Sequence, residues 1–465
     1  MKLNKRKTRY SPFSTGILAG RATKAAGRYT PEQALRRVTM ANLLWESTYY
    51  QSADAIMRQI EELIPQVSSE VIAKLALETR FEQRLRHTPL YLALMLYKYH
   101  GGAGVADLLA KICTRPDMTI DTLAMLPIVF KRNSIKPIPK SVKKGLAMAF
   151  DQYDAYQIAK YKRAGHTVSL VDVVNLVRPI PTQANAAALQ ALVRNETLVA
   201  DTWETNLSAG ADKVETFTRL IQEDKLGALA LLRNLRGMKH AGVRRQVIRQ
   251  GLSQVSSKWL TPLNFLAAQR NAPQFTADLE ALMERSFATQ KISGTTILAV
   301  DVSGSMGALT SSTSGFSRMD LAFALAALAG YMFEDLILVF TAGSDSARKG
   351  KHMVWTNGKG FGIFNDYRHI YSTLGGGGIF THQLCEWLKA EGLAKDADRL
   401  VVLSDSQDID AAYGKQVIAD TAPYKTSYII DISTHTHGIK TGNWTAEING
   451  WSDRLFHYIA EVEKA

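Results

Sequence analysis

Four apolar stretches in the last third of the chain have the length of β-strands, and three of them end at an aspartate. They are Thr295–Val300 before Asp301, Leu336–Phe340, Leu400–Leu403 before Asp405, and Ser427–Ile430 before Asp431. Apolar strands without polar alternation are typical of sheets that are covered on both faces. Helix-like segments at Met319–Phe333 and His382–Ala390 lie between them. Residues 291–465 are therefore predicted to form an α/β doubly wound parallel sheet, which binds ligands at the carboxyl ends of its strands.

The first of these aspartates begins a loop that can bind a divalent cation. The loop reads Asp301-Val-Ser-Gly-Ser-Met306, so Asp301, Ser303 and Ser305 offer oxygen atoms at alternate positions. Carboxylate and hydroxyl oxygens are ligands that Mg²⁺ and Mn²⁺ prefer. We expect Asp405 to complete the site and the glycine run 375–378 to bring Thr381 to the same ion. The alternative is a turn in which Asp301 only caps the following helix.

The first 290 residues are predicted to be helical after a basic arm at residues 1–28. Helix-start signatures recur along this part, and no long alternating strand pattern interrupts them. The signatures stand at Thr30, Ser69, Thr88, Ser169 and Thr261. Many helices of ordinary length with short connections predict an all-α helical-repeat solenoid over residues 29–290, although no clean repeat motif is present.

Charge is divided unevenly between the two halves. Residues 1–290 hold 41 Lys and Arg against 24 Asp and Glu, a net of +17, whereas residues 291–465 hold 15 against 19, a net of −4. Such a basic region is typical of proteins that bind RNA or DNA, and the alternative is a merely basic globular protein. The two cysteines, Cys113 and Cys385, stand far apart, which favours a reduced, cytoplasmic setting. The longest apolar stretch, Leu321–Phe333, is too short to span a membrane.

Motifs in both halves resemble one known family. The Asp301 loop with Asp405 is similar to the metal-ion-dependent adhesion site (MIDAS) of von Willebrand A domains. Relatives place the threonine directly after the glycines, whereas two residues intervene before Thr381 here. Arg233-Asn-Leu-Arg-Gly-Met238 and the segment from Tyr156 to Pro179 resemble TROVE domains. A TROVE domain followed by a von Willebrand A domain is the architecture of the Ro ribonucleoprotein family, so the chain resembles a bacterial or phage Ro-like protein.

The resemblance implies a fold and a set of partners. It implies a HEAT-like ring of helical repeats that binds structured noncoding (Y-like) RNA on its outer face and single-stranded 3′ ends of misfolded RNA in its central hole. It also implies a monomer. The chain departs from the family pattern where Asn175 and Leu176 precede Val177-Arg-Pro179, because relatives carry a histidine there that belongs to the Y RNA contact.

Three groups of basic residues are expected to contact RNA, because Lys and Arg neutralise phosphates and interleaved aromatic rings stack on bases. They are Lys131, Arg132, Lys136, Lys140, Lys143 and Lys144; Lys160, Lys162, Arg163, His166 and Arg178; and Arg233, Arg236, Lys239, His240, Arg244, Arg245 and Arg249. Each group taken alone also fits a solvated helix face. Arg233 and Asn234 have a structural interpretation as well, in which Asn234 binds backbone.

The sequence favours a non-enzymatic RNA-binding protein that acts in RNA quality control or processing. Its α/β domain would recruit a protein partner, such as a nuclease, through the cation. Two alternatives stay open: a protein–protein adapter for an acidic partner, and a metal-dependent phosphoesterase or nuclease. The enzyme would need a second metal or a positioned base near Asp301, and the sequence shows neither clearly.

Overall fold

The structure is a computed structural model that describes most of the chain. The described residues are 30–40, 53–162, 168–257, 260–287, 291–309, 315–393, 395, 397–405, 424–432, 444–449 and 455–463. The predicted arm at residues 1–28 and two predicted RNA contacts, Arg163 and His166, lie outside them. The chain forms two compact units. Unit 1 comprises Met1–Ser47, Gln51–Ala211 and Glu461–Ala465, and unit 2 comprises Thr48–Tyr50 and Asp212–Ala460.

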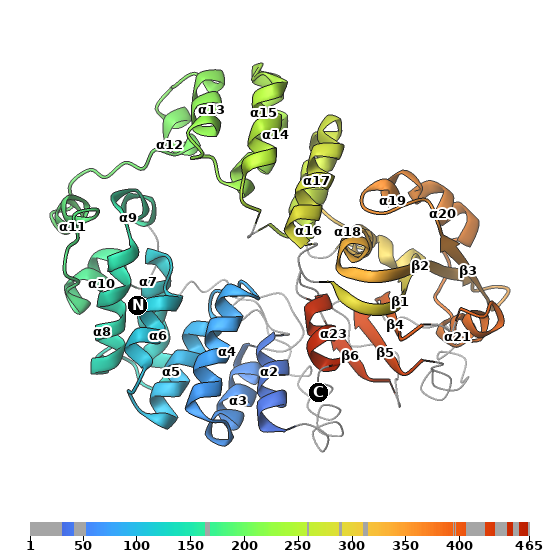
Figure 1. The fold of residues 1–465 in the computed structure, drawn as a ribbon, viewed down its shortest axis with the longest axis horizontal. Coiled ribbons are helices and arrows are strands. Elements are labelled where there is room, and N and C mark those ends of the chain that lie inside the picture. Colours follow the sequence, from blue (N-terminus) through green and yellow to red (C-terminus); the bar gives the residue numbers. More distant parts are fainter. Residues whose placement is uncertain are drawn as a thin grey trace. The chain divides into compact units, whose positions relative to one another are not determined.

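The described part of unit 1 is helical (Figure 1). Its helices are α2 (Pro31–Met40), α3 (Ala53–Leu63), α4 (Ser69–Phe81), α5 (Thr88–His100), α6 (Val105–Ile112), α7 (Pro116–Val129), α8 (Lys140–Ala149), α9 (Ala155–Tyr161), α10 (Leu170–Val177), α11 (Ala186–Val193) and α12 (Trp203–Ser208), with short 3-10 helices η1 (Ile64–Gln66) and η2 (Phe150–Gln152). Next-but-one helices contact each other, as in α4 with α6, α5 with α7 and α6 with α8. This packing is typical of stacked helical repeats, which agrees with the predicted helical part.

The predicted helix starts are largely confirmed. Thr30 and Ser169 each exchange two capping hydrogen bonds with the residue three positions further on. The backbone N–H of Thr261 donates to the side chain of Asn264 at 2.9 Å. The prediction at Ser69 was wrong by one residue, because the side chain of Ser68 accepts the hydrogen bond that caps α4. These contacts are local, which is why the sequence pattern could locate them.

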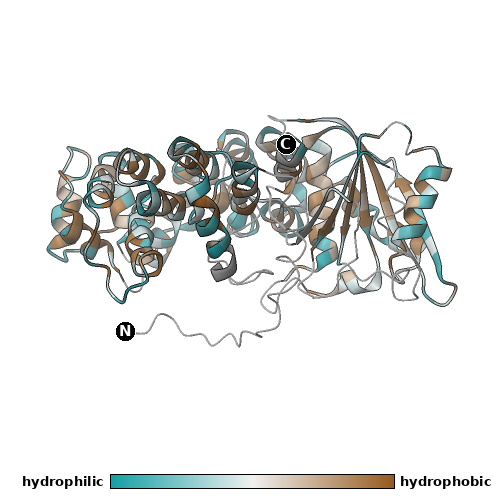
Figure 2. Ribbon diagram, turned by 90° about the horizontal axis from the view of Figure 1, so that it is seen from below, coloured by the Kyte–Doolittle hydropathy of each residue, from teal (hydrophilic) through white to brown (hydrophobic). Residues whose placement is uncertain are grey.

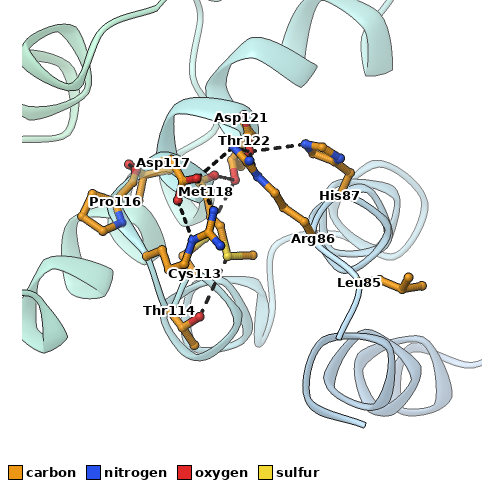
Figure 3. A network of polar contacts seen from close by, with 12 residues as sticks. Leu85, Arg86, His87, Cys113, Thr114, Pro116, Asp117, Met118, Asp121 and Thr122 are labelled. Carbon is orange, nitrogen blue, oxygen red and sulfur yellow. Dashed lines mark hydrogen bonds and ion pairs between the residues drawn. The ribbon is translucent and has the colours of Figure 1, made fainter. Parts of the chain in front are cut away.

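A polar network joins the starts of α5 and α7 (Figure 3). Nε of Arg86 donates to Oδ2 of Asp121 at 2.7 Å, and Nη2 of Arg86 lies 3.0 Å from Oδ2 of Asp117. Asp117 also accepts a hydrogen bond from Nε of Arg115 at 3.0 Å, and Nε2 of His87 lies 3.5 Å from Oδ2 of Asp121. Because Arg86 and Arg115 both pair with carboxylates of the scaffold, part of the positive charge of unit 1 is neutralised within the fold.

Unit 2 begins with helices and continues into a sheet. Its helices are α13 (Lys213–Gln222), α14 (Ala228–Ala241), α15 (Arg245–Gln254), α16 (Pro262–Asn271), α17 (Thr276–Phe287), α18 (Arg318–Met332), α19 (Gly362–Asn365), α20 (Tyr367–Leu374), α21 (Thr381–Ala390) and α23 (Leu455–Glu463), with η3 (Pro273–Phe275) and η4 (Gly304–Gly307). Arg270 on α16 donates to Asp320 on α18 at 3.1 Å. The change from helix to strand falls after Phe287, inside this unit, and the predicted domain boundary at residue 290 stays a prediction.

The sheet has six strands in the order β3-β2-β1-β4-β5-β6. They are β1 (Ile292–Asp301), β2 (Phe333–Ser344), β3 (Lys349–Trp355), β4 (Arg399–Ser404), β5 (Thr426–Asp431) and β6 (Ala446–Asn449). The prediction of a parallel sheet was wrong at one edge, because β3 runs antiparallel to β2 and pairs Trp355 with Leu338. The connection at residues 345–348 is a turn, and so short a link permits only an antiparallel hairpin.

Helices cover both faces of this sheet, as the apolar strands predicted. The ring of Phe323 on α18 lies 5.2 Å from the ring of Phe340 on β2. The preceding residue, Val339, belongs to an apolar cluster with Leu384 and Cys385 of α21. Successive side chains of β2 therefore enter opposite layers, and the central strands are hydrophobic over most of their length (Figure 2).

Both cysteines are buried. Among the described residues, no helix has the length and apolarity that crossing a bilayer requires.

Candidate cation site and nucleic-acid surface

The predicted cation ligands from two strands lie at one edge of the sheet. Strands β1 and β4 are parallel neighbours, with Val300 paired to Leu403. Their ends therefore bring Asp301 close to Asp405. Strand β1 also has β2 on its other side, so the strand order reverses at β1. In open α/β sheets this reversal creates the crevice in which ligands bind.

Hydrogen bonds hold the carboxylate of Asp301 in place. Oδ1 accepts from the backbone N–H of Ser303, and Oδ2 accepts from the hydroxyl of Ser404, both at 2.7 Å. The hydroxyl oxygens of Ser303 and Ser305 lie 3.1 Å apart. Asp301 and Ser303 are buried. The loop thus gathers the three predicted side chains, while Ser404 is a contributor that the sequence reasoning missed.

Asp405 forms an ion pair with a residue that the sequence reasoning also missed. Nη1 of Arg318, the first residue of α18, lies 2.7 Å from Oδ2 of Asp405. Only 6% of the Arg318 side chain is exposed, and none of the Asp405 side chain is. The same nitrogen lies 3.5 Å from the backbone oxygen of Ser305. An arginine at the start of the first α-helix after the cation loop was the available signal, but its partner is 87 residues away in sequence.

The electrostatics of this edge favour a cation. Burial, followed by repulsion from Asp405, raises the pKa of Asp301 from its ordinary value of 3.8 to about 7, although Ser303 and Ser404 oppose the rise. A buried carboxylate next to a second carboxylate is costly to ionise unless positive charge is supplied. Arg318 supplies one such charge, and a divalent ion would supply more. The donor set of carboxylates and hydroxyls fits Mg²⁺ or Mn²⁺.

The glycine run 375–378 lies against the cation loop. The backbone N–H of Gly304 donates to the oxygen of Gly377 at 3.2 Å. A Cβ at Gly304 would lie 2.8 Å from the oxygen of Gly376, so only glycine permits this approach. Thr381 is buried at the start of α21. Its place in the ligand set stays a prediction.

A cluster of three or more His, Cys, Asp or Glu side chains does not occur among the residues that the structure describes. The candidate site therefore depends on hydroxyl oxygens as well as carboxylates. Hydroxyls and carboxylates are hard ligands, which suit Mg²⁺ better than the Cys and His ligands of structural zinc sites do.

Some of the predicted RNA contacts already have a partner within the protein, whereas others are exposed. In unit 1, Nη2 of Arg132 donates to the oxygen of Ile135 at 2.7 Å, and Nζ of Lys131 lies 4.0 Å from a carboxylate oxygen of Glu61. Nζ of Lys160 lies over the ring of Tyr156, 5.6 Å from its centroid. Lys162 donates to the backbone oxygen of Glu196, whereas Lys136, Lys140, Lys143 and Arg178 are exposed.

The third group of predicted RNA contacts contains five exposed basic side chains that lie close together in sequence. We define the α14 stripe as Arg233, Arg236, Lys239, His240 and Arg244, all of which are exposed. Within the described ranges, none of these five side chains forms a hydrogen bond, ion pair or ring contact. The buried face of α14 consists of Leu231, Leu232, Leu235 and Met238. Arg233, Arg236 and His240 therefore lie on the other side of the helix, and Arg244 follows its end.

Two neighbours of the α14 stripe have structural partners. Arg245 donates to the backbone oxygen of Gln274 at 2.9 Å and lies over the ring of Phe275, so this predicted RNA contact already serves the fold. The side chain of Asn234 donates to the oxygen of Ala230 at 2.8 Å. The structural interpretation therefore fits Asn234 and does not fit Arg233.

Two comparisons with known proteins found a match, one to a segment of the chain and one along nearly all of it. The TROVE domain family matches residues 194–297, which include α13–α17 and the α14 stripe. The fold is similar to the crystal structure of the Deinococcus radiodurans RO (RSR) protein, with a TM-score of 0.61 and 16% identity over 93% of this chain and 99% of that one. No curated protein matches the sequence significantly. Residues 194–297 of this chain therefore match the TROVE domain family, and the fold along nearly all of the chain is similar to that of a Ro protein.

Proposed function

We propose that this chain is an RNA-binding protein that holds small structured noncoding, Y-like RNA and the single-stranded ends of misfolded RNA in RNA quality control or processing. The α14 stripe is the observation that carries the proposal. It lies inside the part of the chain that matches the TROVE family. In this proposal the protein is not an enzyme, and its sheet recruits a protein partner through a bound cation.

The charges of the α14 stripe have no counterpart among the described residues, and five of them follow closely along one stretch of chain. On the adjacent helix α15, Nε of Arg249 lies 3.2 Å from Oδ2 of Asp278 on α17. On α13, Nη1 of Arg219 lies 3.1 Å from Oε2 of Glu223. Like charges that cluster without such partners repel one another, and a polyanion removes the repulsion while releasing its own counterions. The stripe is therefore suited to successive phosphates.

The sheet edge has a separate role in this proposal. Asp301, Ser303, Ser305 and Asp405, with Thr381 as a further candidate, would hold Mg²⁺. A bound ion would offer a coordination position to a carboxylate of a protein partner. Arg318 fixes the orientation of Asp405 through the 2.7 Å ion pair. Nothing in this arrangement requires turnover of a substrate, so we propose ligation rather than catalysis.

The RNA proposal is tested by comparing matched arginine variants. Binding of a fluorescein-labelled single-stranded RNA to the full chain is measured by anisotropy over a series of salt concentrations. Arg236→Ala removes an unpaired charge, and Arg249→Ala removes a paired charge from the next helix. We expect Arg236→Ala to weaken binding and to lower the slope of log affinity against log salt by roughly 0.7, the value for one phosphate contact on a single strand. Arg249→Ala should change the slope less.

Two results would count against this reading. Wild-type binding that does not respond to salt, or an absence of binding, would remove the RNA proposal. Tighter binding of an acidic peptide than of RNA would instead favour the adapter alternative. Incubation of the protein with labelled RNA and Mg²⁺ tests the non-enzymatic part, because cleavage that disappears in Asp301→Ala would show a metal-dependent nuclease.

A further inference from the structure

Gly237 lies in α14 at a position where neither packing nor backbone conformation requires a glycine. It is the tenth residue of the fourteen-residue helix Ala228–Ala241 and is exposed. Its backbone is helical, so no left-handed conformation demands glycine. A Cβ built there meets no atom within 4 Å. Glycine is nevertheless one of the least favourable residues inside a helix, because it loses the most backbone entropy on folding.

Two other glycines inside helices have clear packing reasons. A Cβ at Gly145 would lie 2.6 Å from the backbone oxygen of Ala106, because α8 approaches α6 closely there. A Cβ at Gly251 would lie 3.1 Å from a methyl group of Ile221. At Gly237 the same space is open solvent. A glycine kept in open space on a helix is expected where something outside the chain approaches the backbone.

The residues around Gly237 indicate what that ligand is. Arg233 precedes it by one turn, His240 follows it by one turn, and Arg236 is adjacent in sequence. Arg233 and His240 lie about 10 Å apart along the helix axis. An open strip of backbone is therefore flanked by two unpaired guanidinium groups and an imidazole. A narrow, elongated polyanion can lie along it, with its phosphates within reach of both arginines.

We infer that Gly237 forms the floor of a contact for the sugar–phosphate backbone of single-stranded RNA, with Arg233 and Arg236 beside it binding neighbouring phosphates. This inference rests on the proposed RNA function. The absence of a Cβ allows the strand to lie against the helix, which shortens both arginine–phosphate contacts. His240 offers a ring and a hydrogen-bond donor at the end of the strip. Even a methyl group at residue 237 would separate the strand from the helix.

Single-stranded RNA is favoured over an acidic peptide because of its geometry. In RNA the negative charges belong to the chain itself, so they approach the helix only as closely as the backbone does. In a peptide the carboxylates stand on flexible side chains, which can reach an arginine across an added methyl group. A contact with RNA is therefore more sensitive to bulk at residue 237 than a contact with a peptide would be.

The test enlarges the side chain at residue 237 with residues that do not weaken the helix. In the full chain, Gly237→Ala and Gly237→Leu add increasing bulk, and both residues favour helix more than glycine does. Gly227→Ala is the matched control, because a Cβ at Gly227, the residue preceding α14, also meets no atom within 4 Å. Affinity for a labelled oligouridine is measured by anisotropy, and the melting temperature of each variant is measured by circular dichroism.

We expect opposite changes in the two measurements. Gly237→Ala should raise the melting temperature by about 2–4 °C, since an exposed helical glycine is removed. It should weaken oligouridine binding several-fold, and Gly237→Leu should weaken it by about tenfold or more, the loss of a charge-assisted contact. Gly227→Ala should leave binding unchanged.

The outcomes separate this inference from the function on which it rests. If wild-type protein binds oligouridine and Arg236→Ala weakens that binding, but both Gly237 variants bind as wild type does, the inference is overturned and the RNA function stands. If wild-type protein does not bind oligouridine at all, both are overturned. If a polyglutamate peptide displaces the oligouridine and its own binding falls equally in Gly237→Leu, the assignment to RNA backbone is overturned.

Discussion

Replacing Asp301 by asparagine should stabilise the metal-free protein and abolish its response to Mg²⁺. Asp301 is fully buried, and its pKa is raised to about 7, first by burial and then by repulsion from Asp405. Asparagine removes the charge and keeps the shape. Its oxygen can still accept the hydrogen bond from the backbone of Ser303, and its amide can donate to the hydroxyl of Ser404. The substitution therefore tests the effect of the charge at residue 301 separately from that of its hydrogen bonds.

The magnitude follows from the shift in pKa. A rise from 3.8 to about 7 corresponds to a penalty of about 4 kcal/mol in the free energy of unfolding when the carboxylate is ionised. Because the folded protein binds the proton more tightly than the unfolded chain, the penalty is absent below about pH 4, grows as the pH rises, and is complete above about pH 7. We expect asparagine to recover most of it, which raises the melting temperature by roughly 10 °C at about pH 8.

The assay is thermal unfolding followed by circular dichroism, with EDTA or with excess MgCl₂, at about pH 8 and about pH 5. Wild-type protein should be stabilised by Mg²⁺ and, without metal, by the lower pH. Asp301→Asn should show neither response. Asp398→Asn is the control, since Asp398 is an exposed carboxylate just before the opposite end of β4. If Asp301→Asn is no more stable than wild type without metal at the higher pH, or keeps the Mg²⁺ response, the reasoning is refuted.

Substitutions at three further positions test contacts that hold the fold together. Arg318→Met leaves Asp405 buried without its ion-pair partner. Without metal this should lower the free energy of unfolding, measured in urea, by about 3–5 kcal/mol, and Mg²⁺ should restore part of the loss. An unchanged unfolding midpoint would contradict the ion pair. Gly145→Ala places a methyl group 2.6 Å from the backbone oxygen of Ala106, so it should destabilise unit 1 by about 1–3 kcal/mol in the same assay, the opposite sign to Gly237→Ala. Ser169→Ala removes the hydroxyl that caps α10 and should lower stability by about 1 kcal/mol, whereas Ser169→Asp should not.

Much of the local structure could be predicted because it depends on near neighbours in sequence. The helix starts at Thr30, Ser169 and Thr261 depend on side chains three residues further along. The strand that ends at Asp301 follows from an apolar run, and the spacing of the cation loop is visible in six residues. Such patterns are local consequences of helix and strand geometry.

The sequence alone determined the helical and sheet-forming parts of this chain, the excess of positive charge in the first part, and the oxygen-rich loop. Only the tertiary structure decided which charges are free. Arg86 and Arg249 meet carboxylates on other helices, Arg318 meets Asp405 across 87 residues, and the α14 stripe meets none within the described ranges. The physical reason is that an ion pair forms only where packing brings two side chains within about 4 Å, and packing depends on the register of distant elements rather than on the residues beside each charge.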